Sequence, residues 1–189
     1  MKKQKKSSVW LYVGGVFGIL LILIVLLFSV DTEYTSYKNT QYGFHMVYPN
    51  DWDLFEAGET PGVAVQFRSP KQNELDIFPE NVSIVVQDLP PTMLDLEMYS
   101  KTAIEQLTAV FEGMMVIEEQ GDTTFAGQKA YKIIYRGTDP GEGPNIKLMH
   151  IWTISGFKAY QFNFGSQLSQ WDVFIGQVDK MANSFKLDK

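Results

Sequence analysis

His45 and His150 are the side chains of this sequence best suited to acid–base or metal chemistry, because an imidazole titrates near neutral pH and binds metal ions. Each lies within a segment whose pattern predicts a β-strand. The sequence has no His-x-x-x-His spacing and no recognisable carboxylate motif that would complete a metal or acid–base site. We therefore interpret both histidines as packed or solvent-facing strand residues, and no catalytic residue is predicted.

The motifs of nucleophilic and nucleotide chemistry are also missing from the sequence. It contains no Gly-x-Ser-x-Gly elbow and neither the Walker nor the dinucleotide glycine pattern. It contains no cysteine, which removes thiolate nucleophiles, disulfides and cysteine-based metal sites. We expect a protein that is not an enzyme and has no cofactor, and no residue is assigned to a cofactor or a metal.

Two acidic segments are the candidates for binding a metal ion. One is the turn-rich run 139–144, which contains Asp139 and Glu142, and the other contains Glu74, Asp76 and Glu80. Calcium prefers carboxylate and carbonyl oxygens, so such loops bind it if they converge. Neither matches the twelve-residue calcium loop, and we therefore interpret them as solvated surface loops. A calcium or manganese site remains the alternative.

The N-terminal part of the chain has the pattern of a membrane anchor. Residues 9–30 contain no charged side chain, and about 20 helical residues suffice to cross the hydrocarbon layer. Four lysines precede this run, whereas Asp31 and Glu33 follow it. Because positive flanks stay in the cytoplasm, we expect a cytoplasmic basic tail at 1–8, a transmembrane helix at 9–30 and an extracytoplasmic remainder.

A cleavable signal peptide is the alternative interpretation of this segment. Its apolar core is normally about 7 to 15 residues long and ends at a small-x-small site. Here the run is longer and its exit reads Leu27-Phe28-Ser29-Val30-Asp31, so we favour an uncleaved anchor. Gly14 and Gly18 form a Gly-x-x-x-Gly pair, which allows a weak helix–helix dimer.

The part beyond the anchor is acidic and of single-domain size. It carries all 22 acidic residues and 12 of the 16 basic ones, a net charge of −10. Phosphate binding needs a basic face, so a nucleic-acid partner is excluded. We expect a short stalk at 31–36 and a folded domain at 37–189. The expected partner of this domain is an extracytoplasmic protein or a membrane complex.

Hydrophobic periodicity predicts the elements of this domain. Alternating or apolar runs predict strands, and steps of three and four residues predict two amphipathic helices. The expected strands are 44–48, 63–67, 82–87, 115–119, 130–136, 146–154 and 158–164, and the expected helices are 95–112 and 168–185. Residues 155–157 read as a hairpin turn. The order predicts an α+β fold, an α-β-α sandwich around a central antiparallel sheet, preceded by one transmembrane helix.

Short motifs give the domain a family resemblance. They are Tyr42-Gly43-Phe44, the Tyr48-Pro49 strand end with Trp52 behind it, Gly127 to Tyr131, and Asn183-Ser184-Phe185. The pattern resembles the PsbP-like domains, which share an α-β-α sandwich with the Mog-type Ran-binding proteins, and it covers roughly residues 37–187. No ion-binding or partner-binding residue of that family matches a position here.

The resemblance also carries functional expectations. Plant PsbP proteins are soluble lumenal subunits that help photosystem II to retain calcium and chloride, and bacterial relatives mostly lack an assigned activity. Together with the expected anchor and the absence of a catalytic motif, the resemblance leads us to expect a non-catalytic, membrane-anchored binding or assembly module. The alternative is a domain that binds a small ligand or a calcium or manganese ion at the membrane surface, in a pocket lined by aromatics between sheet and helix.

Overall fold

The structure is a computed structural model, and the part that it describes is the folded domain with gaps in its loops. The described residues are 32–56, 62–74, 76, 78–111, 114–137 and 145–188. The expected tail at 1–8 and the expected transmembrane helix at 9–30 lie outside them. Among the described residues, no helix is both long and apolar enough to span a bilayer.

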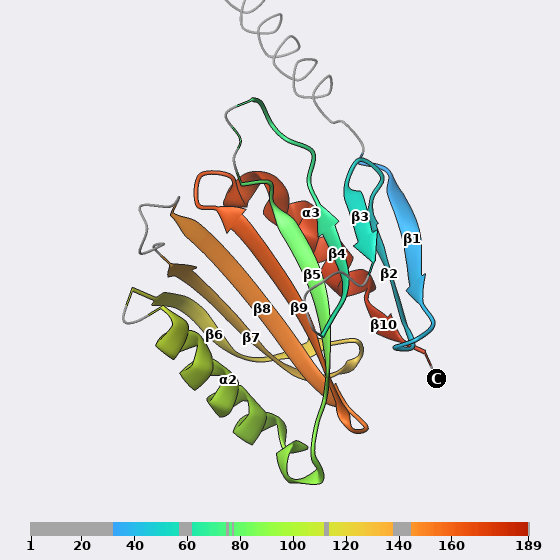
Figure 1. The fold of residues 1–189 in the computed structure, drawn as a ribbon, viewed down its shortest axis with the longest axis vertical. Coiled ribbons are helices and arrows are strands. Elements are labelled where there is room, and N and C mark those ends of the chain that lie inside the picture. Colours follow the sequence, from blue (N-terminus) through green and yellow to red (C-terminus); the bar gives the residue numbers. More distant parts are fainter. Residues whose placement is uncertain are drawn as a thin grey trace, which may run out of the picture. The chain divides into compact units, whose positions relative to one another are not determined.

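Ten strands and three helical segments make up the described domain (Figure 1). In chain order they are β1 (Tyr34–Asn39), β2 (Phe44–Pro49), β3 (Asp53–Glu56), β4 (Val63–Arg68), β5 (Asn81–Asp88), the short 3-10 helix η1 (Pro91–Met93), α2 (Leu96–Val110), β6 (Val116–Phe125), β7 (Gln128–Gly137), β8 (Ile146–Ser155), β9 (Lys158–Gln167), α3 (Trp171–Ser184) and β10 (Lys186–Leu187).

The central layer is a seven-stranded antiparallel sheet in the order β3-β4-β5-β9-β8-β7-β6. Tight turns join β6 to β7 and β8 to β9. The second is the hairpin expected at 155–157, whereas the first was not expected. Both residues of the first turn have positive φ, 54° at Ala126 and 73° at Gly127, which matches the right-handed twist of the strands that they connect. In the strand order of the sheet, β6 lies at one end and β3 at the other.

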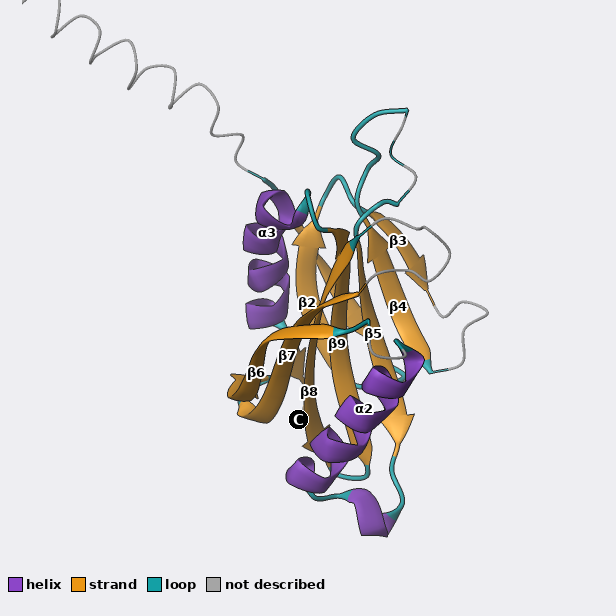
Figure 2. Cartoon of the chain, turned by 90° about the vertical axis from the view of Figure 1, so that its left-hand side faces the viewer, coloured by secondary structure: helices purple, strands orange, loops and turns teal. Residues whose placement is uncertain are grey.

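The two longer helices cover opposite faces of this sheet (Figure 2). Side chains alternate across a strand, so β8 contributes to both faces. Trp152 packs with the residues beneath α2, whereas Met149 and Ile151 belong to the cluster beneath α3. This arrangement confirms the expected α+β sandwich with an antiparallel sheet and two amphipathic helices.

The larger core lies on the α3 side, where a small sheet in the order β1-β2-β10 also packs. Phe185 is its centre: its ring stacks on Phe44 at 5.0 Å and on Phe125 at 4.6 Å between centroids. All three side chains are buried. Burying a side chain of this size contributes about 2 to 3 kcal/mol, so these contacts tie the small sheet to the large one.

The structure corrects three expectations about the elements. The stalk expected at 31–36 is wrong in part, because β1 begins at Tyr34, which pairs with Pro49. Two short strands, β3 and β10, were not expected, since four and two residues give too little alternation to recognise. β6 is twice as long as the expected strand at 115–119. Its second half was not recognised in the sequence because it is polar.

Candidate functional site

A groove of about 770 Å³ separates α2 from the β6–β7 end of the large sheet, and we call it the α2 groove. Its helical wall is formed by one side of α2, including Glu97, Ser100, Lys101 and Glu105. Its other wall is formed by β6 and β7, including Gln120, Asp122, Lys129 and Tyr131. A volume of this size falls within the range of small-molecule sites, about 300 to 1,000 Å³.

Anchoring of α2 over the central strands opens this groove. The helix begins at its N-cap Asp95, whose carboxylate accepts a hydrogen bond from the Met98 N–H at 2.8 Å. One turn later, buried Ser100 accepts a hydrogen bond from the Trp152 indole N–H of β8 at 2.8 Å. Its neighbour Tyr99 donates to Gln87 of β5 at 3.0 Å. The helix is thus fixed on β5 and β8, away from β6.

The floor of the groove is an aromatic stack. The ring of Tyr131 stacks on Trp152, with 5.5 Å between centroids and 22° between planes. The Tyr131 hydroxyl donates to the Gln120 amide oxygen at 3.4 Å across the β6–β7 pair. Because Trp152 is also held by Ser100, the floor and the helical wall form one connected, hydrogen-bonded unit.

The rim of the groove is charged, with an excess of acidic residues. Glu97 and Glu105 of α2 and Asp122 of β6 are exposed, and so are Lys101 and Lys129. None of these five takes part in an ion pair among the residues that the structure describes. An open groove with an aromatic floor and free carboxylates is suited to binding a polar, positively charged group.

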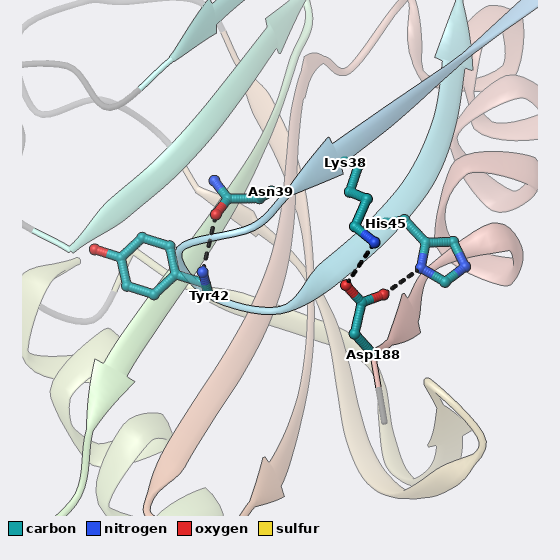
Figure 3. Close-up of polar contacts among 5 residues, drawn as sticks. All are labelled: Lys38, Asn39, Tyr42, His45 and Asp188. Carbon is teal, nitrogen blue, oxygen red and sulfur yellow. Dashed lines mark hydrogen bonds and ion pairs between the residues drawn. The ribbon is translucent and has the colours of Figure 1, made fainter.

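His45 lies elsewhere, on the small sheet, in a polar cluster with the C-terminal end of the chain (Figure 3). Its Nδ1 is 2.8 Å from Asp188 Oδ1, and Lys38 Nζ of β1 is 3.2 Å from Asp188 Oδ2. The hydrogen bond from His45, and then that from Lys38, lower the pKa of Asp188.

This cluster fastens the chain end to β2 rather than preparing a reaction. The Asp188 N–H donates to the Gly43 carbonyl at 2.8 Å, next to the pairing of β10 with β2. The nearby Ser184 hydroxyl donates to the Met181 carbonyl at 2.7 Å and accepts from the Val47 N–H at 2.9 Å. Ser184 is thus engaged by backbone groups at the end of α3 and not by His45.

His150 lies on β8 in the large sheet, so the two histidines are not brought together. Its Nε2 is 3.2 Å from the Tyr135 hydroxyl of β7. Burial lowers its pKa from 6.5 to about 4, which keeps the imidazole neutral at pH 7. Both histidines lie in strands, as expected; the His45 side chain is exposed, whereas His150 is partly buried.

Of the acidic segments, Asp76 and Glu80 are buried, so their expected place in a solvated loop is wrong. The Asp76 carboxylate accepts the Gln72 and Phe78 N–H groups at 3.0 and 3.2 Å. Glu80 accepts the Ser69 hydroxyl at 3.2 Å, and burial raises its pKa. These carboxylates organise their own loop, which no local pattern in the sequence indicates.

Metal ligation is not evident in the part of the chain that the structure describes. Within it, no group of three or more His, Asp or Glu residues is arranged to hold a metal ion. Asp139 and Glu142, in the other acidic segment, lie outside the described residues. The calcium or manganese alternative therefore stays a prediction.

A pocket lined by aromatics between sheet and helix was expected as an alternative, but no residue was assigned to it, although the helical wall of the α2 groove left a signal. Glu97, Lys101 and Glu105 recur at four-residue steps on the polar side of α2. Such a row is usually a solvated face. Only the pairing of β7 with β6, which places the end of the sheet beside that row, turns the row into one wall of a groove.

The fold is an α-β-α sandwich with a groove between α2 and the β6–β7 end of its sheet. The sequence profile of the PsbP family matches residues 32–187, and the chain belongs to this family. No curated protein sequence matches the chain significantly.

Solved structures with the same fold come from distant organisms. The solution structure of cyanobacterial PsbP (CyanoP) from Synechocystis sp. PCC 6803 matches with a TM-score of 0.60 and 22% identity, over 85% of this chain and 95% of that one. LpqN of Mycobacterium tuberculosis, described as involved in cell envelope biogenesis, matches with a TM-score of 0.55 and 11% identity, over 84% of this chain and 92% of that one. The Ran-binding protein Mog1p of Saccharomyces cerevisiae matches with a TM-score of 0.57 and 10% identity, over 83% of this chain and 96% of that one. At these identities the matches establish the fold alone.

Proposed function

We propose that this protein is a non-catalytic binding or assembly module that residues 9–30 hold at the outer surface of a membrane. The observation that carries the proposal is the order of the chain. The match to the PsbP family begins at residue 32, immediately after a 22-residue run without a charged side chain. A basic tail on one side of that run and an acidic domain on the other favour a cytoplasmic N-terminus and an extracytoplasmic domain.

The α2 groove supports a binding role for the domain. It is open, it has a fixed aromatic floor, and its rim carries carboxylates that are free of ion pairs within the described residues. The expected partner is an extracytoplasmic protein or membrane complex. Contact between two anchors through Gly14 and Gly18 is a weaker, additional proposal.

Co-purification from membranes tests this function. A tagged full-length chain is extracted from membranes with mild detergent, and a tagged fragment of residues 1–36 serves as the control. We expect a stoichiometric partner that the full chain retains and the anchor fragment does not. Reproducible absence of any such partner, or recovery of the same partner with the fragment alone, contradicts the proposal.

Small-ligand or ion binding is the second candidate, and the volume of the α2 groove favours it. A ligand that binds the folded state raises its melting temperature in proportion to the logarithm of its concentration. Thermal unfolding of the full chain with calcium chloride, manganese chloride or a lipophilic ligand panel therefore tests this candidate. A melting temperature that none of these additions raises counts against it.

A further inference from the structure

β6 presents an open edge of the large sheet beside the α2 groove. It is the end strand of the sheet, and among the described strands only β7 pairs with it. In an antiparallel hairpin with a two-residue turn, alternate residues exchange both backbone hydrogen bonds with the partner strand. Counting from the turn at Ala126-Gly127, Phe125 and Thr123 are bonded to β7. The N–H and C=O groups of Asp122 and Thr124 therefore point to the open edge.

The same residues border the groove. Asp122 is opposite Tyr131 in the β6–β7 register, so the Asp122 side chain lies on the face of the sheet that α2 covers. A strand that paired with this edge would send every second side chain toward α2, where Glu97 and Glu105 are exposed. A register shift between Ile117 and Glu119 interrupts the ladder, so the regular edge is residues 119–125.

The charges of β6 determine which kind of strand can pair with its open edge. β6 contains Glu118, Glu119 and Asp122 and no basic residue. Glu118 pairs with Arg136 and Lys147, and Glu119 pairs with Lys132. Asp122 has no ion pair among the described residues, and its position favours a basic neighbour. A second copy of β6 is disfavoured, because it would place these carboxylates side by side.

We propose that the β6 edge and the α2 groove together form a docking site for an extended, lysine- or arginine-rich segment of an extracytoplasmic protein, which adds to the sheet as an eighth strand. This inference rests on the proposed binding function and names its partner chemistry. Backbone hydrogen bonds to Asp122 and Thr124 provide affinity. Basic side chains that reach Asp122, Glu97 and Glu105 provide specificity.

Three short fluorescein-labelled peptides test the site with the full chain in detergent micelles. The first alternates lysine with valine and threonine, the second has glutamate for lysine, and the third is the lysine peptide with alternate backbone amides N-methylated. We expect only the first to bind in fluorescence anisotropy, because strand addition needs both the positive charges and the free amides. On binding, the amide protons of Asp122 and Thr124 should gain protection from hydrogen exchange.

Two charge-reversed variants localise the binding. Asp122→Lys combined with Glu105→Lys should weaken the lysine peptide by about tenfold or more, as expected when close opposite charges become repulsive. Asp53→Lys is the matched control, since Asp53 is exposed on β3 at the other edge of the same sheet. It should leave the affinity unchanged.

Several outcomes would overturn the inference. One is equal binding of the N-methylated peptide, which would show attraction by charge alone, and another is equal weakening by Asp53→Lys. A third is co-purification of a membrane partner that the Asp122→Lys, Glu105→Lys variant retains undiminished. That last result would remove the docking site and leave the proposed function intact, whereas a wild-type chain without any partner would remove the function itself.

Discussion

His150 and Glu80 show how burial shifts the pKa of titratable groups in this fold. Desolvation is the main cause in both: it lowers the pKa of the histidine and raises that of the carboxyl group. Perturbed groups often mark catalytic sites. Here His150 hydrogen-bonds Tyr135 and Glu80 hydrogen-bonds Ser69, and neither lines the α2 groove. We therefore assign both to the structure of the domain.

The buried imidazole makes stability depend on pH. As pH falls below about 6.5, the unfolded chain binds a proton at His150, whereas the folded chain does so only near its pKa of about 4. The folded state therefore loses on the order of 1 to 3 kcal/mol across this window. His150→Gln should remove that loss. Urea unfolding at about pH 7 and about pH 4.5 compares the two chains, and an identical decrease in both would contradict the assignment.

At the scale of elements, the bond between Ser100 and Trp152 is central to the contacts that hold α2 on the sheet. Trp152 is buried, and its indole N–H donates to the Ser100 hydroxyl at 2.8 Å. Ser100→Ala leaves that N–H buried without this acceptor, which should lower the free energy of unfolding by about 1 to 3 kcal/mol.

Thr102→Ala is the control for this prediction. Thr102 lies on the same helix, and its hydroxyl donates only within α2, to the Met98 carbonyl at 3.1 Å. Its loss should change stability by less than about 0.5 kcal/mol. The urea unfolding midpoints of the two variants test this prediction. Equal effects of the two substitutions would mean that the bond to Trp152 does not hold the helix.

The end of α2 makes a second contact that depends on the lack of a side chain. Phe111 packs on Gly137 of β7, where an added Cβ would lie 2.3 Å from the Phe111 ring. Gly137→Ala should therefore destabilise the domain by about 1 to 3 kcal/mol. Gly176→Ala in α3 should do the opposite and stabilise it by about 0.5 to 1 kcal/mol, because an added Cβ there meets no atom within 4 Å. Thermal unfolding of both variants checks the pair, and a stabilised Gly137→Ala variant would refute the packing.

At the scale of the whole molecule, the sequence predicted what periodicity can encode. The alternation of β7, β8 and β9 and the apolar stripes of α2 and α3 led to the correct class of fold. Periodicity cannot say which strands pair across a long separation, such as β5 with β9. The position of α2 over β5 and β8, which opens the groove, depends on that pairing and on the bond between Ser100 and Trp152, so the residues of the α2 groove could not be predicted from local pattern.

The burial of polar side chains was the other feature that the sequence could not predict. Asp76 and Glu80 lie in a segment whose composition is that of a surface loop, and yet both are buried. Their hydrogen bonds run partly to Ser166, which is far away in the sequence. The histidines were easier, because each lies in a segment whose pattern already predicted a strand.

The central claim is that a membrane anchor holds a PsbP-family domain outside the cytoplasm. The chain has no cysteine, so single-cysteine variants report their side of the membrane without interference. Asp172→Cys lies at an exposed position of α3, and Ser7→Cys lies in the expected cytoplasmic tail.

Labelling with a membrane-impermeant maleimide on intact spheroplasts, followed by carbonate extraction, is the most direct measurement. We predict that Asp172→Cys is labelled on intact spheroplasts, that Ser7→Cys is labelled only after lysis, and that both proteins stay in the membrane pellet. Labelling of Asp172→Cys only after lysis, or release of the protein by carbonate, would contradict the account.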